Sequence, residues 1–388
     1  MIARIFFIII ILIILPDLYI DAHYLRHRKR YNWWKRLLWW LPAIAMIAYT
    51  LKLTFEKDFV PTNMTVINTY LFLLGIIVAP KILFMIFSFI GWRFCKWRHK
   101  HFNAGNIIGI LCGIITICLL IYGSTAGIRN LEVTHIDYYS DKLPESFDGY
   151  RIVQFTDVHA GSFTGNSVKI LESFMDSINA QDGDLIVFTG DLQNKQPSEL
   201  YQLKDILGRL KARDGVYSIL GNHDYSEYIT ADDDTKRRNE EEHVRMHKEF
   251  GWKILLNEND KIYRGSDSIV IAGSENDGRP PFPEKADYTK TMNGVKDDAF
   301  VVMLQHDPTA WQRNILPETN AAITLSGHTH GGQFRVLGWS PAAVAYDQWG
   351  GFYQKGDRAI YVSTGLGGVI PFRIGVDPEI AVITLHKK

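Results

Sequence analysis

Seven polar side chains in the C-terminal two-thirds of this sequence share one setting, because each follows closely after a short apolar run. They are, in chain order, Asp157, His159, Asp191, Asn222, His306, His328 and His330. If the apolar runs are strands, these residues stand at the carboxyl ends of those strands, where open α/β sheets bind their ligands. We therefore expect the seven side chains to converge on one crevice.

This set of side chains is suited to holding metal ions. It offers imidazole nitrogens and carboxylate or amide oxygens and no sulfur, which favours divalent ions such as Mn, Fe, Zn or Mg. Seven ligands exceed the three or four that one catalytic zinc takes from a protein. They suit two ions about 3.5–4 Å apart with a shared carboxylate, the arrangement that supports in-line displacement at phosphorus. The sequence therefore predicts two divalent ions without fixing the metal.

The apolar runs also predict the elements that would position this site. Runs at 151–156, 185–189 and 216–220 have the character of strands, and helical spacing at 166–180 and 200–210 separates them. Strands that alternate with helices indicate crossover connections on a mostly parallel sheet. Later runs, separated by turn residues, suggest a second sheet; they lie at 269–272, 300–304, 321–325, 359–362 and 380–385. The expected fold class is α/β, with two packed sheets.

The motifs that contain these residues, and their order along the chain, resemble those of the calcineurin-like metallophosphoesterases. The family pattern is D-x-H, G-D, G-N-H-D/E, a lone H and G-H-x-H, and the chain carries each element within about 136–385. The words G-N-H-D at 221–224 and G-H-T-H at 327–330 are specific, whereas a lone G-D is not. The sequence F-D-G-Y-R-I at 147–152 resembles the corresponding sequence in the membrane-bound or exported bacterial branch of the family. The resemblance implies a metal-dependent phosphoric ester hydrolase with a two-sheet α/β/β/α metallophosphoesterase sandwich.

The resemblance also implies a role for each residue of the site. It assigns the seven side chains to two ions: Asp157, His159 and His330 hold the first, Asn222, His306 and His328 hold the second, and Asp191 bridges both. His223 would not be a ligand but would donate a proton or hydrogen bond to the leaving oxygen, with Asp224 orienting its ring. A histidine near its ordinary pKa can do this, while a hydroxide held by both ions attacks phosphorus in line.

Three other residues could bind metal or substrate. His243 and His247 stand four apart in a predicted helix and could hold a metal, but they adjoin the densely charged segment 231–242. That segment predicts an exposed loop leading into a surface helix, so we expect an exposed histidine pair. Arg373 follows a late glycine-rich loop and could either contact a substrate phosphate or form a surface ion pair; the sequence does not decide between these roles.

The N-terminal third has a different character, since its apolar segments are long enough to cross a bilayer, for which ~20 residues are needed. There are four of them, at about 2–20, 37–55, 66–92 and 106–123. No small-residue cleavage site follows the first segment, which favours an uncleaved anchor over a signal peptide. We expect an all-α transmembrane anchor of four helices at 1–125 and the metallophosphoesterase domain at 126–388.

One charged residue stands inside the third segment. Lys81 follows Pro80 near the middle of that segment. A long, tilted helix with a kink accounts for both residues. The alternative, which stays open, is a functional polar site within the membrane.

Positive charges predict the orientation of the four segments. Loops one and three carry the basic residues, which are Arg26, Arg28, Lys29, Arg30, Lys35 and Arg36 in the first and Arg93, Lys96, Arg98 and Lys100 in the third. The second loop is close to neutral. Because positive loops stay in the cytoplasm, the N-terminus and the C-terminal domain are expected on the extracytoplasmic side. A segment that failed to span would reverse this orientation.

Together these features predict a membrane-anchored phosphoesterase that hydrolyses phosphodiesters or pyrophosphates, and the membrane favours a lipid-linked or envelope-linked substrate. Two alternatives stay open: a cytoplasm-facing pyrophosphatase of lipid precursors, and a non-catalytic binding module tethered to the membrane. Acidic and basic residues balance at 42 each, so charge gives no argument for a nucleic-acid partner. All three cysteines lie in or beside the apolar third, which leaves the C-terminal region without a thiolate ligand or nucleophile.

Overall fold

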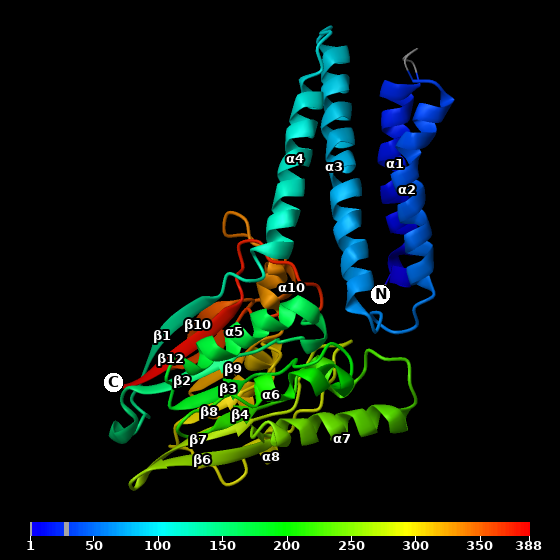
Figure 1. The fold of residues 1–388 in the computed structure, drawn as a ribbon. Coiled ribbons are helices and arrows are strands. Elements are labelled where there is room, and N and C mark those ends of the chain that lie inside the picture. Colours follow the sequence, from blue (N-terminus) through cyan, green and yellow to red (C-terminus); the bar gives the residue numbers. More distant parts are fainter. Residues whose placement is uncertain (1, 27–30) are drawn as a thin grey trace. The chain divides into compact units, whose positions relative to one another are not determined.

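Two units make up the chain, Met1–Thr125 and Ala126–Lys388, and the computed structural model describes residues 2–26 and 31–388 (Figure 1). The first unit is helical, and every strand among the described residues belongs to the second. The division falls directly after helix α4 (Ala104–Thr125).

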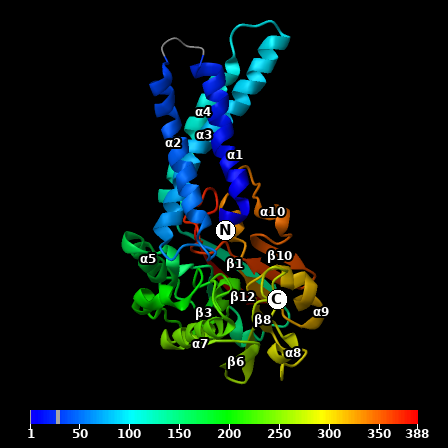
Figure 2. The same cartoon turned by 90° about the vertical axis from the view of Figure 1, so that its right-hand side faces the viewer.

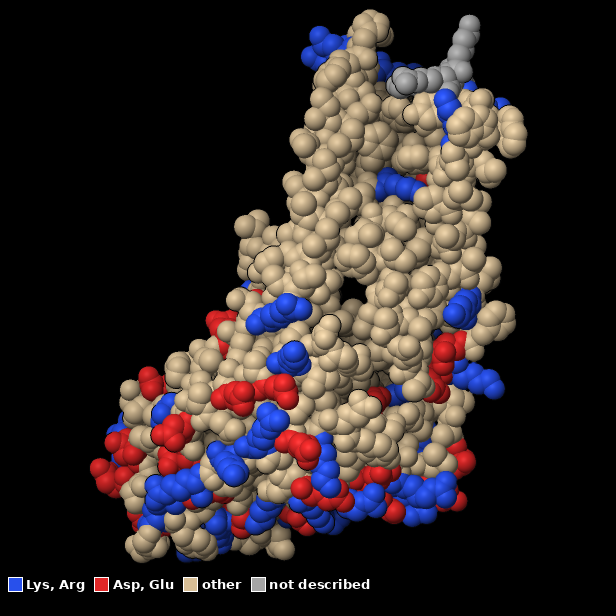
Figure 3. Space-filling view, viewed as in Figure 1, with Lys and Arg blue, Asp and Glu red and all other residues tan. Residues whose placement is uncertain are grey.

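Four long helices form the N-terminal unit: α1 (Phe6–Ile20), α2 (Trp33–Thr54), α3 (Met64–Trp97) and α4. Each is long and apolar enough to cross a membrane, the first as part of a helical stretch Ile2–Leu25. Charged side chains are sparse along these helices and dense over the C-terminal unit (Figure 3). The structure confirms the four predicted segments. Most of them extend into their polar flanks, because backbone hydrogen bonding continues where hydropathy has already fallen.

Small residues let α3 and α4 pack closely. Gly105, Gly109 and Gly113 recur at every fourth residue along α4. A Cβ atom at Gly109 would lie 2.8 Å from the Cα atom of Phe84, and one at Gly105 would lie 2.1 Å from the carbonyl oxygen of Phe87. The two backbones therefore approach more closely than larger residues would allow, as in the small-xxx-small contacts of membrane helices.

Lys81 of α3 has a charged partner. Its ammonium group donates to both carboxylate oxygens of Asp17 in α1, at 2.8 and 2.9 Å, and Asp17 is buried. A second pair joins Arg36 of α2 to Asp21, directly after α1, through hydrogen bonds of 2.6 and 2.7 Å. Charges in hydrocarbon are costly unless they are paired, so these contacts tie α1 to α2 and α3. Sequence pattern did not connect Lys81 with Asp17, because 64 residues separate the two.

The first sheet of the C-terminal unit has six strands in the order β1, β12, β2, β3, β4, β5. Their bounds are β1 Glu132–Ser140, β12 Glu379–Lys387, β2 Tyr150–Phe155, β3 Leu185–Phe188, β4 Val216–Ser218 and β5 Lys253–Ile254. Strands β2 to β5 run parallel, and β12 lies between β1 and β2, parallel to the first and antiparallel to the second. The last strand of the chain is therefore internal to this sheet.

The second sheet also has six strands, in the order β10, β11, β9, β8, β7, β6. Their bounds are β10 Gly351–Lys355, β11 Arg358–Val362, β9 Ile323–Ser326, β8 Val301–Leu304, β7 Asp267–Gly273 and β6 Glu258–Arg264. The four inner strands are parallel, and the two edge strands, β10 and β6, are antiparallel to their neighbours.

The two sheets pack face to face, and helices cover their outer faces (Figure 2). One core lies between the sheets and combines buried residues of β2 to β4 with those of β7 to β9. A second core joins the first sheet to α5 (Val168–Asn179), α6 (Lys204–Leu207) and α7 (Asp233–Glu249). A third joins the second sheet to α8 (Tyr288–Thr291) and to the turn before α9 (Leu316–Glu318). The predicted α/β/β/α sandwich is confirmed.

Three details of the predicted topology were wrong. The run at 380–385 becomes β12 of the first sheet, not a strand of the second, because an apolar run does not specify which neighbour it pairs with. The expected helix at 200–210 is a 3₁₀ turn, Pro197–Leu203, followed by the short α6. Strands β1, β6 and β10 were missed, since their half-exposed positions interrupt the apolar runs that mark inner strands.

Candidate metal centre

Five strand ends from both sheets bring the predicted site residues together. Asp157 and His159 follow β2, Asp191 follows β3, Asn222 follows β4, His306 follows β8, and His328 and His330 follow β9. Three groups have their ligand atoms within 4.8 Å of one another; they are Asp157, His159 and His330, then His159, Asp191 and His223, and then Asp191, His306 and His328. Because these groups share members, they form one continuous site.

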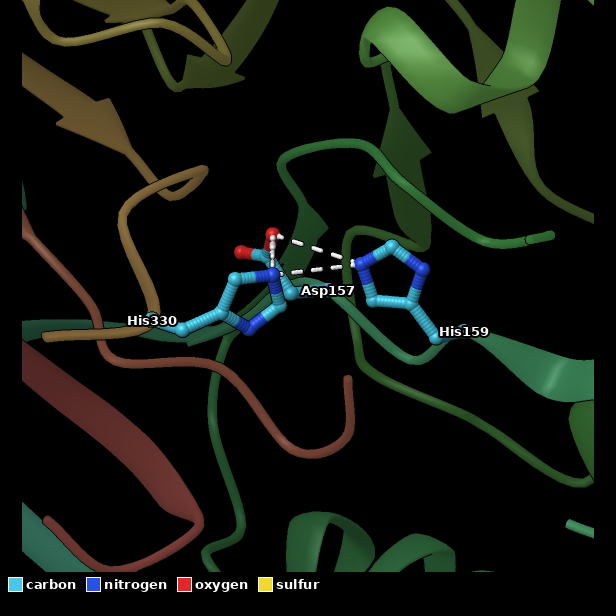
Figure 4. A group of neighbouring side chains, drawn as sticks. All are labelled: Asp157, His159 and His330. Carbon is cyan, nitrogen blue, oxygen red and sulfur yellow. Dashed lines mark hydrogen bonds and ion pairs between the residues drawn. The ribbon is translucent and has the colours of Figure 1, made fainter. Parts of the chain in front are cut away.

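The first group places three potential ligand atoms around one point (Figure 4). The Nε2 atoms of His159 and His330 face each other at 3.2 Å. Asp157 Oδ1 lies 3.4 Å from His330 Nε2 and 4.0 Å from His159 Nε2. Two imidazole nitrogens and a carboxylate oxygen that converge in this way fit a shared cation.

Asp191 connects this group to the next. Its Oδ2 atom lies 3.7 Å from His159 Nε2 and 3.1 Å from His306 Nε2. The other ring nitrogen of His306, Nδ1, lies 2.7 Å from the carbonyl oxygen of Thr189. A proton on Nδ1 satisfies that contact and leaves Nε2 as the coordinating nitrogen, as is usual for a metal-binding histidine. Asp191 therefore stands where a carboxylate shared by two ions would stand.

Asn222 and His328 are the two predicted ligands that remain to be described. Asn222 Nδ2 donates to the hydroxyl of Tyr228 at 2.8 Å, and its Oδ1 atom is buried without a hydrogen-bond partner among the described residues. His328 Nε2 lies 3.0 Å from the hydroxyl oxygen of Tyr346. The peptide N–H of His328 points to both carboxylate oxygens of Asp157, at 3.0 and 3.2 Å. An acceptor oxygen left unpaired in a buried position is costly, and a cation would relieve that cost.

The residues therefore fit divalent cations on three observations: the facing imidazole nitrogens, the shared carboxylate and the unpaired amide oxygen. The donor set of nitrogen and oxygen without sulfur agrees with this assignment. The number of ions, their identity and the ligand assigned to each remain predictions.

The backbone of the site is strained at the residues that matter. Five of the seven predicted ligands have left-handed backbone: φ is 51° at Asp157, 51° at His159, 61° at Asp191, 74° at His328 and 51° at His330. Such conformations cost about 1–3 kcal/mol each outside glycine and persist where the surrounding structure enforces them. This clustering marks a functional site independently of side-chain chemistry.

Glycines make room for the two aspartates. A Cβ atom at Gly221 would lie 2.2 Å from Asp191 Oδ1, and one at Gly327 would lie 2.3 Å from Asp157 Oδ2. Any larger residue at either position would displace the carboxylate beside it. The glycines of the G-N-H-D and G-H-T-H words are thus required by close approach.

Burial and charge set the protonation of the site. Burial, with His223 nearby, lowers the pKa of His159 to about 3, and burial holds the pKa of His330 well below its usual value. Both rings are therefore neutral, which is the form that binds metal. Burial also opposes the charged form of His306, but the carboxylate of Asp191 outweighs it and raises the pKa of His306 to about 10. A cation that takes Nε2 of His306 must displace a proton.

His223 is held by groups that the sequence did not single out. Its Nδ1 atom lies 2.6 Å from the carbonyl oxygen of Asn194, and its ring stacks on Tyr228 with centroids 4.1 Å apart. Its peptide N–H donates to Asp191 Oδ1 at 2.8 Å. The structure therefore places the Asn194 carbonyl, and not Asp224, at the ring nitrogen that needs an orienting acceptor.

Asp224 binds backbone N–H groups and not the ring of His223. Its buried carboxylate accepts four peptide N–H groups, which are those of Asp191, Leu192, Gln193 and Gly221, at 2.8 to 3.2 Å. It thereby fastens the turn that carries Asp191 to the turn that carries Asn222 and His223. The prediction that Asp224 orients the His223 ring is corrected in this way, because both of its oxygens already serve the backbone.

His243 and His247 are buried, so the expectation of an exposed pair was wrong. His243 Nδ1 lies 2.9 Å from Gln193 Oε1, and its Nε2 lies 3.1 Å from His247 Nε2 and 3.3 Å from Asp224 Oδ1. His247 Nδ1 lies 2.9 Å from the hydroxyl oxygen of Ser218. The pair supports the loops of the site through these contacts, and it belongs to none of the groups of potential metal ligands found among the described residues.

A signal for this burial was present in the sequence. His243, Met246, His247 and Phe250 are all buried and recur at the spacing of one helix face. The dense charge of 231–242 hid that stripe, because it occupies the first half of α7 and the remaining faces. No comparable signal marks Tyr228, Tyr346 or the Asn194 carbonyl, whose contacts depend on loop conformation.

Arg373 is buried, so the surface ion pair considered from the sequence is wrong. Its Nη2 atom donates to the carbonyl oxygens of Thr364, Gly365 and Gly367 at 2.7 to 2.9 Å. Gly365 packs directly against Asp157, since a Cβ atom there would lie 2.6 Å from the Asp157 Cβ atom. Arg373 therefore shapes the loop behind a predicted ligand.

Comparisons with known proteins agree with this geometry. Residues 150–332 match the family described as calcineurin-like phosphoesterase, and residues 3–128 match the family described as probable calcineurin-like phosphoesterase, transmembrane domain. The four apolar helices and the match to the transmembrane-domain family together confirm that this is a membrane protein.

Three relatives illustrate the match. A transmembrane protein with metallophosphoesterase domain from Danio rerio is 31% identical over 286 residues, which cover 72% of this chain and 62% of that protein. The uncharacterized metallophosphoesterase YkuE of Bacillus subtilis is 32% identical over 66% of this chain and 85% of its own. The UDP-2,3-diacylglucosamine pyrophosphatase LpxG of Chlamydia trachomatis is 26% identical over 65% of this chain and 88% of its own.

The family and the names of these relatives confirm the predicted class, a phosphoric ester hydrolase that depends on metal. The motifs on which the resemblance rested lie on the strand ends that form the site. The chain belongs to the calcineurin-like phosphoesterase family, and its N-terminal unit is that of the transmembrane members.

Proposed function

We propose that this protein uses two divalent cations to hydrolyse phosphodiester or pyrophosphate bonds in a lipid-linked or envelope-linked substrate. The observation that carries the proposal is the position of Asp191, whose Oδ2 atom faces His306 at 3.1 Å and His159 at 3.7 Å. One carboxylate between two sets of imidazoles is the arrangement of a two-metal site. The membrane-spanning helices favour a substrate that stays at the membrane.

The residues of the chain would divide the work. When bound, the ions supply an activated water and neutralise charge on the phosphoryl oxygens. His223 keeps Nδ1 on the Asn194 carbonyl, 2.6 Å away, so its Nε2 atom is the one that can give a proton to the leaving oxygen. Tyr228 stacks on that ring and also accepts from Asn222, which fixes both side chains through one phenol.

The test is hydrolysis of bis-p-nitrophenyl phosphate by the purified full chain, stripped with chelator and reloaded with Mn²⁺. Activity should return with the metal in the wild type and in the matched control Asp267→Asn, which lies on β7 away from the site. Asp191→Asn should lose at least about 100-fold, since even outer-shell changes at metal sites cost about 10–100-fold. A folded, metal-loaded wild type without activity would overturn the proposal.

A second candidate follows from the similarity to LpxG, which is named as a UDP-2,3-diacylglucosamine pyrophosphatase. A nucleotide-linked lipid precursor is a cytoplasmic substrate, so this function needs the C-terminal unit on the cytoplasmic side. The basic first and third loops favour the opposite side. Protease accessibility of the C-terminal unit in intact cells distinguishes the extracytoplasmic phosphoesterase from the cytoplasm-facing pyrophosphatase.

The third alternative is a non-catalytic binding module. It predicts that the protein binds no metal and that Asp191→Asn leaves its function unchanged.

A further inference from the structure

The helices of the N-terminal unit border an open cavity of about 430 Å³. All four helices contribute to its walls, and most of the lining side chains are apolar, among them Ile20, Phe84, Ile110 and Ile114. Volumes of this size are typical of small-molecule pockets in proteins. All of its lining residues except Tyr31 belong to the segments that are apolar enough to cross a membrane.

The cavity follows from uneven helix packing. Gly109 and Gly113 of α4 line it and bring α4 against α3, where a Cβ atom at Gly113 would lie 3.1 Å from the Pro80 Cβ atom. The neighbouring Ile110 and Ile114 point away from that tight contact and remain 52% and 53% exposed. Small residues thus let α3 and α4 pack closely, while Ile110 and Ile114 keep about half of their surface uncovered by the described residues.

Lys81 and Tyr24 are among the polar residues of the cavity wall. Lys81 lines it, and two of its three N–H donors go to Asp17, at 2.8 and 2.9 Å. Its ammonium group also lies 5.0 Å from the centre of the Trp39 ring, which lines the cavity too. Tyr24 lines the opposite part, and its hydroxyl binds Ser88 and Asn106 at 2.5 and 2.8 Å. The wall therefore offers one ammonium N–H whose charge is already balanced.

We infer that this cavity binds the hydrocarbon chain of one membrane lipid, with an ester or hydroxyl oxygen of that lipid accepting a hydrogen bond from Lys81. The surroundings of these helices supply hydrocarbon chains, and an apolar hollow open to them is filled by such a chain at little cost. Asp17 cancels the charge of Lys81, so the site suits an uncharged acceptor and not a phosphate, which would need a second cation. A charged pair kept within the membrane-spanning segments is itself a mark of function.

The site is separate from the metal centre, and its argument does not use the proposed hydrolase activity. Lys81 lies close to half-way along α3, between Met64 and Trp97. The bound oxygen therefore belongs to a group that reaches well below the membrane surface. An ester or hydroxyl group of a lipid meets this requirement when the whole group is drawn below the interface together with the chain that enters the helix bundle.

The experiment uses the full chain in lipid nanodiscs that contain phosphatidylcholine with a photoactivatable diazirine in its acyl chain. After illumination, peptide mass spectrometry locates the labelled residues. Labelling should concentrate on cavity residues such as Phe84 and Ile114. The filling variant Ile110→Trp should reduce it about tenfold, a change of about 1.4 kcal/mol in binding. Ile108→Trp is the matched control, since Ile108 is 46% exposed on the same helix but does not line the cavity.

Two further variants keep the test decisive. Ile114→Trp fills the same space from one turn further along, in case Ile110→Trp fails to fold, which thermal unfolding would detect. The double variant Asp17→Asn with Lys81→Met removes the ammonium donor without leaving a lone charge, and it should shift labelling away from Phe84. Equal labelling of Ile110→Trp and Ile108→Trp, or labelling spread evenly over the outer helix faces, would overturn the inference. Phosphodiesterase activity plays no part in either outcome.

Discussion

At the scale of single residues, Asp191 organises the metal centre. One of its oxygens accepts the peptide N–H of His223, and the other faces the rings of His306 and His159. Its own peptide N–H is held by Asp224 at 2.9 Å. The carboxylate therefore cannot move without disturbing every group that it touches, which suits a ligand that must stay fixed while substrate changes.

Metal binding should release protons at this site. Asp191 raises the pKa of His306 to about 10, so without metal the ring is charged below that pH. Coordination requires the neutral ring, and each bound cation at Nε2 must expel that proton. Calorimetric titration of the chelator-stripped protein with Mn²⁺ at pH 8, in buffers of different ionisation enthalpy, should give about one proton released, with affinity rising as pH rises. Heats that do not depend on the buffer would contradict this.

The role of His223 can be separated from a structural one by varying the leaving group. His223→Gln should cost about 10²-fold or more on esters of alkyl alcohols, because such leaving oxygens need a proton. The loss should be small for p-nitrophenyl esters, whose leaving group departs without one. The measurement is kcat/KM over a series of phosphodiesters. An equal loss on all of them would mean that the ring only positions its neighbours.

Residue types and spacing were sufficient to place the seven predicted ligands at strand ends, because the apolar runs already marked those strands. They were not sufficient to show how those ligands are held. The left-handed backbone at Asp157, the carbonyl of Asn194 beside His223 and the stacking of Tyr228 are properties of loop conformation. No short sequence pattern records them.

At the scale of elements, α7 supports the site through two buried histidines. Burial lowers the pKa of His243 to about 3 and holds that of His247 well below 6.5, so both rings are neutral in the fold. In the unfolded chain both take up protons below about pH 6.5. Folding stability is therefore full above that pH and is lost as pH falls from 6.5 toward 3, by up to about 1.4 kcal/mol per pH unit for each ring.

This dependence can be checked by thermal unfolding of the full chain between pH 7.5 and 5, with chelator present so that metal binding does not contribute. The wild type should lose stability as the pH falls. His243→Gln should start less stable but show a shallower dependence, since one of the buried rings that must take up a proton on unfolding is gone. His135→Gln, on an exposed position of β1, is the matched control and should follow the wild type. Identical slopes for all three would contradict the argument.

Helices and strands could be predicted where their apolar residues follow one clear pattern along the sequence. The inner strands β2, β3, β8 and β9 are continuous apolar runs, and the sequence located each of them to within about two residues. The strand β6, Glu258–Arg264, has only one buried position, so its pattern resembles a loop. Sheet membership was beyond prediction for β12, because pairing depends on neighbours that are far apart in the chain.

At the scale of the whole molecule, the number of membrane crossings decides which compartment the site faces. Four spans place both ends of the chain on one side, and the basic first and third loops favour the extracytoplasmic side for them. Trypsin added to spheroplasts should therefore remove a tag attached after Lys388. A cytoplasmic marker protein should stay intact in the same sample. Loss of the tag only after permeabilisation would place the unit inside and favour the precursor pyrophosphatase.

The position of β12 has a consequence for how the protein is made. This strand comes from the final residues, Glu379–Lys387, yet it stands between β1 and β2 and supplies every backbone partner that β1 has in the sheet. While the ribosome is still translating, β1 therefore has nothing to pair with, although the helices before it have already emerged. The first sheet can close only after Glu379–Lys387 have been translated. A message cut short before these codons would yield an inserted anchor joined to a domain that cannot finish folding.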